Sequence, residues 1–166
     1  WTVSNPAPVA NDDAVSTNED TSVSGNVLLD SPAGDVADSD PDGDALVVTQ
    51  FVINGATYDA GESATIAGVG TFTLDSTGAY TFTPDANWNG PVPTITYTIS
   101  DQEGGTDTAN LTITVDPVND APVIAGDGQS GLVIEAGHLD DNTSVPGVPL
   151  TTGSFDASDV DGDTLS

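Results

Sequence analysis

The sequence predicts an all-β protein made of antiparallel β-sandwich repeats in tandem, with the second repeat truncated. Three observations support this fold class. Apolar and polar residues alternate strictly in several short segments, which is typical of half-buried strands. Turn-forming residues separate these segments, and a motif near the start of the chain returns later in it.

The predicted strands share an inward row of aliphatic or aromatic side chains and an outward row that is mostly Thr, a good strand former. They lie at residues 45–53, 70–75, 78–84, 94–100 and 109–116. Turns are predicted between them at residues 54–55, 76–78, 89–91 and 104–105. No segment carries a convincing helical stripe, because Gly and Pro interrupt the chain too often. Short strands with frequent turns predict a β-sandwich.

The repeat is visible in two places. Ala7-Pro8-Val9 returns as Ala121-Pro122-Val123, and the pattern of residues 40–46 returns at residues 159–165. This spacing is close to the roughly 100 residues of an immunoglobulin-sized sandwich, so it predicts a tandem array. We expect the truncated copy to be completed by further sequence or by strands of a neighbouring chain. The predicted parts are the end of a preceding repeat or an N-terminal strand (1–7), a complete sandwich (8–116), a calcium-binding linker (117–122) and the first part of a second sandwich (123–166).

The charge of the chain limits the classes of molecule that it can bind directly. It has no Lys or Arg, 27 acidic residues and one His, which gives a formal net charge of −27. This excludes nucleic acid and anionic membrane surfaces as direct partners, because both require Lys or Arg against phosphate. Most of the acids are Asp, whose short side chain favours turns. We therefore expect loops that bind a cation, and without Cys no thiolate metal site can form.

The segment "DSDPDGD", residues 38–44, places four carboxylates on alternate positions, with Gly43 permitting a tight turn. Ca²⁺ takes roughly six to eight oxygen ligands from carboxylates, carbonyls and water. The spacing matches the start of an EF-hand loop, but the twelfth position is Thr49 instead of Glu and a predicted strand follows. The segment is therefore interpreted as a calcium loop between strands, with an acidic turn as the alternative.

Further acidic and amide side chains gather near the start of the first sandwich, after the strand at 94–100, at the linker and in the second copy. A sandwich collects its loops at its two ends, so we expect these groups to meet where successive domains abut and to bind Ca²⁺ there. The predicted metal ligands are Asp12, Asp13, Glu19, Asp20, Asp38, Asp40, Asp42, Asp44, Asp101, Glu103, Asp116, Asn119, Asp120, Glu135, Asp159, Asp161 and Asp163.

Residues 18–48 and 78–123 resemble the cadherin-like tandem repeats of large bacterial surface adhesins, and residues 134–166 resemble the opening of a VCBS-type repeat. The resemblance implies an immunoglobulin/cadherin-like fold. It also implies secreted, calcium-binding proteins of RTX-adhesin type that act in cell attachment and biofilm.

Three short motifs carry the resemblance to cadherins. Residues 116–122 resemble the cadherin linker "DxNDNAP", residues 101–103 resemble "DRE", and residues 38–40 resemble "DxD". Two positions depart from these patterns, because Gln102 replaces the cadherin Arg and Ala121 stands at the second Asn. These departures leave the number of ligands per ion at the junction open.

The main functional hypothesis is a calcium-binding structural repeat of an extracellular adhesin or filament, stiffened by Ca²⁺ between domains. Its expected partners are neighbouring repeats or identical subunits, with a surface glycan or a protein receptor as a further partner. Two alternatives stay open: a fibre subunit completed by strands from a neighbouring chain, and a calcium-dependent glycan-binding module.

Enzyme activity is not expected. His138 is the single histidine, and the chain offers no Ser nucleophile in an elbow motif and no second imidazole for a triad or a zinc site. Paired carboxylates could hydrolyse glycosides only at a fixed separation in a cleft. Acids this abundant around Gly turns produce pairs without catalytic meaning.

Overall fold

The computed structural model describes residues 4–29 and 36–120, together with four two-residue strands between residues 123 and 158. The chain divides into two compact units, Trp1–Val118 and Asn119–Ser166. The division falls inside the stretch 117–122 that the sequence predicts as a linker. Among the described residues, no helix is long and apolar enough to cross a membrane.

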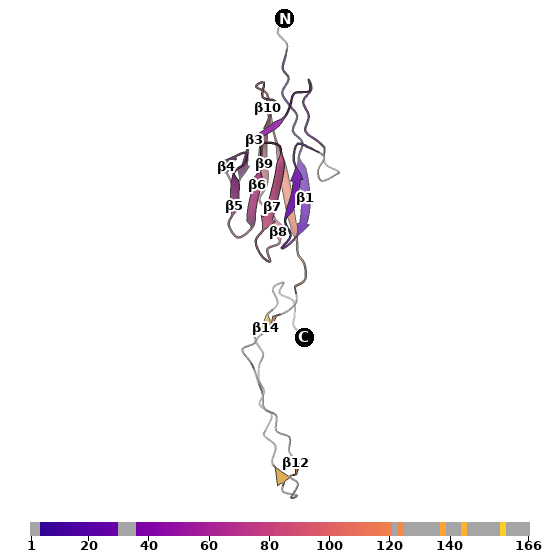
Figure 1. Ribbon diagram of the computed structural model, residues 1–166, viewed down its shortest axis with the longest axis vertical. Helices are drawn as coiled ribbons and strands as arrows, with labels where there is room; N and C mark the ends of the chain where they lie inside the picture. The colour runs from indigo at the N-terminus through magenta and orange to yellow at the C-terminus, as the bar shows by residue number, and fades with distance from the viewer. Residues whose placement is uncertain are drawn as a thin grey trace. The chain divides into compact units, whose positions relative to one another are not determined.

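The first unit is a β-sandwich of two sheets (Figure 1). The larger sheet has the order β1-β10-β9-β3-β4, with β8 also paired to β10, and the smaller sheet has the order β2-β7-β6-β5. The strands are β1 (Asp13–Asn18), β2 (Val23–Asn26), β3 (Val47–Ile53), β4 (Ala56–Asp59), β5 (Ser63–Ile66), β6 (Gly70–Leu74), β7 (Ala79–Pro84), β8 (Gly90–Pro91), β9 (Ile95–Ser100) and β10 (Thr106–Asp116). The predicted all-β sandwich is confirmed. One pairing differs from the antiparallel prediction, because β1 runs parallel to β10.

Strands β3, β6, β7, β9 and β10 form at the five predicted segments. Their burial alternates as their sequence does, and in β9 every second residue from Ile95 to Ile99 is buried. The pattern does not reveal the other strands of the sandwich. Most of them have four residues or fewer, too few for a clear alternation, and β1 begins with a buried acid.

The core between the sheets is built on aromatic rings. Phe51 of β3 stacks on Tyr58 of β4 at 5.2 Å between ring centroids. Phe51 also meets Phe72 of the opposite sheet edge-on at 5.4 Å, and Phe72 lies 6.2 Å from Tyr80. Such pairs add about 0.5–1.5 kcal/mol beyond the burial of their area. The pair of Phe51 and Phe72 joins the two sheets directly.

The β3–β4 hairpin forms at the predicted turn at residues 54–55. Asn54 and Gly55 both have positive φ, at 52° and 78°. A two-residue hairpin needs this conformation at both central positions, and the Asn-Gly pair adopts it readily.

In the second unit the structure describes two short strand pairs. β11 (Val123–Ile124) is antiparallel to β14 (Ala157–Ser158), and β12 (Gly137–His138) is antiparallel to β13 (Ser144–Val145). The predicted ligands Glu135, Asp159, Asp161 and Asp163 lie outside the described residues.

Candidate metal centre

Loops from three parts of the sequence meet at the end of the sandwich where β10 begins. We call it the proximal end and define it by residues 5–12, 38–44 and 101–107. Gln102 Nε2 donates to the carbonyl oxygen of Ala45 at 3.1 Å, which joins the β9–β10 loop to the acidic loop. Val9 exchanges two backbone hydrogen bonds with Ser39, of 2.8 and 3.0 Å. The proximal end therefore collects acids that are far apart in the sequence.

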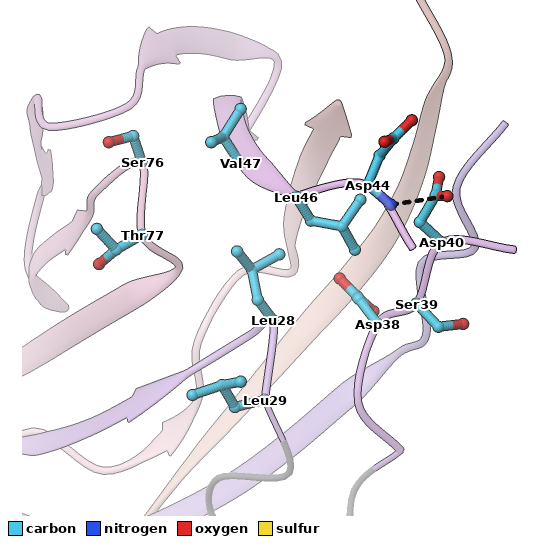
Figure 2. A pocket seen from close by; sticks show the side chains of 10 residues that line it. All are labelled: Leu28, Leu29, Asp38, Ser39, Asp40, Asp44, Leu46, Val47, Ser76 and Thr77. Atoms are coloured by element: carbon cyan, nitrogen blue, oxygen red, sulfur yellow. Dashed lines mark hydrogen bonds between the residues drawn. The ribbon is translucent and has the colours of Figure 1, made fainter. Parts of the chain in front are cut away.

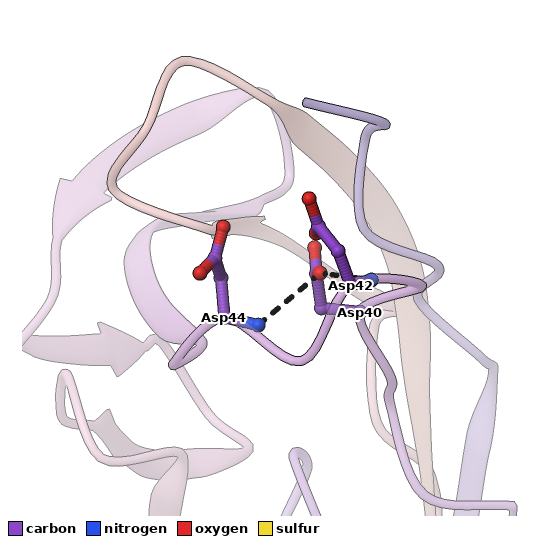
Figure 3. A group of neighbouring side chains, drawn as sticks. All are labelled: Asp40, Asp42 and Asp44. Atoms are coloured by element: carbon purple, nitrogen blue, oxygen red, sulfur yellow. Dashed lines mark hydrogen bonds between the residues drawn. The ribbon is translucent and has the colours of Figure 1, made fainter. Parts of the chain in front are cut away.

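Asp40 builds the turn that gathers three of the predicted ligands. Its Oδ1 accepts the backbone N–H groups of Asp42, Gly43 and Asp44 at 3.0, 3.0 and 3.2 Å. Gly43 has a φ of 91°, which a side chain would make costly. One carboxylate oxygen from each of Asp40, Asp42 and Asp44 lies within 4.8 Å of the others (Figure 3). Three converging carboxylate oxygens could form part of the shell of six to eight oxygens that a hard cation such as Ca²⁺ takes.

The charges of this group are not balanced by protein atoms. The side-chain hydrogen bond that Asp40 and Asp42 share raises the pKa of Asp42 and lowers the pKa of Asp40. Such a bond needs a proton on one of the two carboxylates. With both ionised, Asp40 Oδ2 is buried and finds no hydrogen-bond donor among the described residues. A cation bound among the three carboxylates would supply the missing positive charge.

A second group of acids surrounds the hydroxyl of Tyr97, a core residue of β9. The hydroxyl lies 2.8 Å from Asn11 O, 2.9 Å from Asp13 Oδ2 and 3.4 Å from Asp38 Oδ2. Burial raises the pKa of Asp38 to about 6, although its hydrogen bond from the Asn11 N–H opposes the shift. Burial and the charges of Asp38 and Asp13 raise the pKa of Tyr97 above its usual range. The sequence does not show that the Tyr97 hydroxyl lies among acids, because the alternation of its strand marks Tyr97 only as a core residue.

Asp101, Asp107 and Asp12 already accept hydrogen bonds from the protein. Asp101 is 2% exposed and accepts the N–H groups of Glu103 and Gly105, at 2.8 and 2.9 Å. Burial raises the pKa of Asp101, but these hydrogen bonds and one from Asn5 outweigh it, so the net shift is downward. Asp107 Oδ2 accepts from Ala10 N at 2.9 Å, and Asp12 Oδ1 accepts from Asn110 N at 2.8 Å.

Comparison with known proteins connects this geometry to a family. The bacterial cadherin-like domain matches residues 5–117. The chain belongs to this family. Among solved structures, it is similar to a nucleoside hydrolase-related hypothetical protein from Saccharophagus degradans that is associated with carbohydrate metabolism, at 20% identity and a TM-score of 0.42. That likeness covers 68% of this chain and 26% of the other. A comparison with curated proteins found no match.

The cadherin-like domain carries other predicted ligands at its opposite, distal end, where β10 finishes. Glu19 is 4% exposed; its Oε1 accepts the N–H of Val118, and its backbone N–H donates to Asp116 O at 2.9 Å. Asp20 Oδ1 accepts the N–H of Asn87 at 2.9 Å. The eleven residues of β10 separate the two ends by roughly 33 Å, at about 3.3 Å per residue.

Within the first unit, the predicted ligands are divided between the two ends of the sandwich. The acids of residues 12–20 do not form one cluster, because β1 carries Asp13 at its proximal start and leads to Glu19 at its distal end. Asp101 and Glu103 lie at the proximal end, away from Asp116, although the cadherin motifs suggest a shared junction. Asn119 and Asp120 belong to the second unit, where Asn119 Nδ2 donates to Asp120 O at 3.0 Å.

A hollow of about 480 Å³ adjoins the acidic loop of the cadherin-like domain (Figure 2). Leucine and valine side chains line one side, and the carboxylates of Asp38, Asp40 and Asp44 line the other. Trp88, near the distal end, is half-buried and packs against the core.

Proposed function

We propose that this chain is a calcium-binding structural repeat of an extracellular bacterial adhesion protein, with a binding and stiffening role and no catalytic one. The single observation that carries the proposal is the group of Asp40, Asp42 and Asp44. Their oxygens converge within 4.8 Å in a chain that has no Lys or Arg to neutralise them. Membership of the bacterial cadherin-like family supports the same conclusion.

Calcium suits this site better than magnesium. Ca²⁺ accepts irregular sets of six to eight oxygens, whereas Mg²⁺ demands near-ideal octahedral geometry and gives up its water reluctantly. Asp40 Oδ1 already accepts three backbone hydrogen bonds, so Asp40 Oδ2, Asp42 and Asp44 are the oxygens that remain for the ion. Water and loop carbonyls would complete the shell.

Neutralisation of charge is the proposed mechanism of stiffening. Without metal, the acidic loop is held against the repulsion of its own carboxylates. With metal, the folded state gains RT ln(1 + [L]/Kd) of stability. Extracellular calcium modules commonly bind at roughly 10⁻⁴ to 10⁻³ M. The domain would therefore gain rigidity at extracellular calcium concentrations, as suits a repeat in the stalk of an RTX-type adhesin or a biofilm filament.

Thermal unfolding by circular dichroism tests the proposal on the whole chain, in millimolar Ca²⁺, in the same concentration of Mg²⁺ and in chelator. We expect Ca²⁺ to raise the melting temperature clearly and Mg²⁺ to do so much less. Asp42→Asn should remove most of the calcium effect, because it withdraws one ligand without breaking the turn that Asp40 holds. Asp59→Asn is the matched control, since it removes one exposed carboxylate on β4. Equal melting curves in Ca²⁺ and chelator would overturn the proposal.

A further inference from the structure

We propose that the proximal end is a docking site for the polypeptide that leads into the sandwich. Its occupant is the extended segment of residues 5–11, and Asp101, Asp107 and Asp38 hold this segment by hydrogen bonds. These three acids hold residues 5–11 in place, and we call them the clamp. The clamp needs no metal and goes beyond the calcium role proposed above.

Each of the three carboxylates accepts one hydrogen bond from the segment. Asn5 Nδ2 donates to Asp101 Oδ2 at 2.8 Å. The backbone N–H of Ala10 donates to Asp107 Oδ2 at 2.9 Å, and that of Asn11 donates to Asp38 Oδ1 at 2.7 Å. The contacts are spread along the whole segment, so they fix its direction as well as its position.

Backbone contacts complete the clamp. Val9 pairs with Ser39 through two hydrogen bonds, and Asn11 Nδ2 donates to Ala37 O at 3.1 Å. The hydroxyl of Tyr97 lies 2.8 Å from Asn11 O, within hydrogen-bonding distance. Both the β9–β10 loop and the acidic loop therefore take part in holding one short stretch of chain.

Gly105 provides the space in which the segment lies. A Cβ at this position would come within 2.1 Å of Asp101 Oδ2 and within 2.9 Å of both Ala7 Cα and Pro8 Cδ. Any larger residue would push the segment off the β9–β10 loop. Gly105 therefore allows the close approach of Ala7 and Pro8 as well as the turn that the sequence predicts.

The sequence of the segment fits this mode of attachment. Pro6 and Pro8 have no N–H and restrict their neighbours to extended backbone, so the segment is stiff but cannot pair as an ordinary strand. Its donors lie on either side of the prolines, at Asn5, Ala10 and Asn11. Residues 119–123 repeat the pattern Asn-x-Ala-Pro-Val of residues 5–9. The pattern therefore marks a segment that a complete sandwich of this kind would clamp.

The hydrogen bonds of Asp101 indicate that this residue holds the segment and does not bind a cation. Its Oδ1 accepts from Glu103 N and Gly105 N, and its Oδ2 accepts from Gly105 N at 3.0 Å and from Asn5. Both oxygens are thus occupied by protein donors in a residue that is almost fully buried. The structure assigns Asp101 a positioning role, although the sequence places it among the metal ligands.

The test exchanges the donor and the acceptor of the Asn5–Asp101 pair. Asn5→Asp sets two carboxylates against each other, whereas Asp101→Asn leaves two amides, which can still form one hydrogen bond if the amide of Asn5 turns over. The double variant, Asn5→Asp with Asp101→Asn, restores one donor and one acceptor. Asn5→Ala removes the contact without touching the β9–β10 loop, and Asp59→Asn controls for the loss of one charge. Hydrogen exchange followed by mass spectrometry on the whole chain, in chelator, reports the protection of peptides that cover residues 4–11.

We expect Asn5→Ala and Asn5→Asp to speed amide exchange in this segment about fivefold to tenfold, as loss of one part-buried hydrogen bond implies, and Asp101→Asn to speed it less. The double variant should recover at least half of the lost protection on a logarithmic scale, and peptides from β9 and β10 should stay unchanged in Asn5→Ala. Unchanged protection in Asn5→Ala would overturn the clamp. Additive losses in the double variant would do the same, because they would show no coupling between the two residues.

The clamp and the calcium proposal fail independently. Protection of residues 4–11 is measured in chelator, so it does not depend on whether Asp40, Asp42 and Asp44 bind an ion. The calcium-dependent rise in melting temperature should persist in Asn5→Ala, since Asn5 is not part of that group. Loss of the calcium response in Asn5→Ala would contradict the separation of the two sites.

Discussion

At the scale of the residue, the hydroxyl of Tyr97 lies at a point where acceptors outnumber donors. It has one hydrogen to donate, yet Asn11 O, Asp13 Oδ2, Val27 O and Asp38 Oδ2 all lie within 3.5 Å. Asp38 is 9% exposed, so water replaces the missing donors only in part. Burial raises the pKa of Asp38, and the hydrogen bonds from Asn11 and Tyr97 offset this only in part, so its carboxyl group is easier to protonate in the folded protein than in the unfolded chain.

This difference predicts how stability changes with pH. The pKa of Asp38 is raised to about 6, above the value near 3.9 of an unfolded chain. Between these values the folded state binds more protons than the unfolded state, so the contribution of Asp38 falls as pH rises through this window. Urea unfolding in chelator at several pH values from about 4.5 to 7.5 measures it. As the pH rises, the free energy of unfolding of the parent chain should fall relative to that of Asp38→Asn. A constant difference would show that Asp38 does not titrate in this range.

At the scale of the element, β6 and β7 approach each other more closely than a side chain allows. A Cβ on Gly70, the first residue of β6, would lie 2.3 Å from Thr83 O and 2.9 Å from Pro84 Cα, both backbone atoms of β7. The strand pair therefore depends on Gly at this position. Gly61 also has a positive φ, of 97°, but has no atom within 4 Å of its Cβ position.

The two glycines make a matched pair of substitutions. Gly61→Ala should cost about 1–2 kcal/mol, the usual penalty for a side chain in a left-handed conformation. Gly70→Ala should cost more than about 3 kcal/mol, because the backbone of β7 has to move as well. Free energies of unfolding in urea measure both values. Equal losses in the two variants would mean that β6 and β7 can separate at no cost.

At the scale of the whole molecule, the net charge of −27 acts against folding. Every charged side chain except His138 is negative, so long-range electrostatic interactions between side chains are repulsive, and burial and backbone hydrogen bonds have to outweigh them. Salt weakens this repulsion, because the Debye length falls from about 30 Å at 0.01 M to about 3 Å at 1 M.

We therefore expect NaCl alone to stabilise the protein in chelator. Raising NaCl from 0.01 to 1 M should increase the melting temperature by at least about 5 °C, equivalent to roughly 1 kcal/mol in a domain of this size. Sucrose at a concentration that leaves the ionic strength unchanged separates screening from general solute effects. A melting temperature that does not respond to NaCl would show that the acids are too well solvated to repel one another.

The strands with a clear alternation, such as β7 and β9, can be predicted from sequence alone, because inward and outward side chains differ along a half-buried strand. The acidic loop can be predicted in the same way, since the spacing of Asp40, Asp42 and Asp44 lies within one turn. The sequence pattern does not predict short strands such as β4 and β5, because a stretch of four residues is compatible with several structures.

Which acids share a site depends on how the strands pack in three dimensions. β1 separates Asp13 from Glu19, although both lie in one acidic stretch of the sequence. Asn5 and Asp101 form a hydrogen bond across 96 residues of sequence. Local patterns report the environment of each residue along its own strand. The pairing of distant loops depends on strand order and register, which the chain settles only when the two sheets pack together.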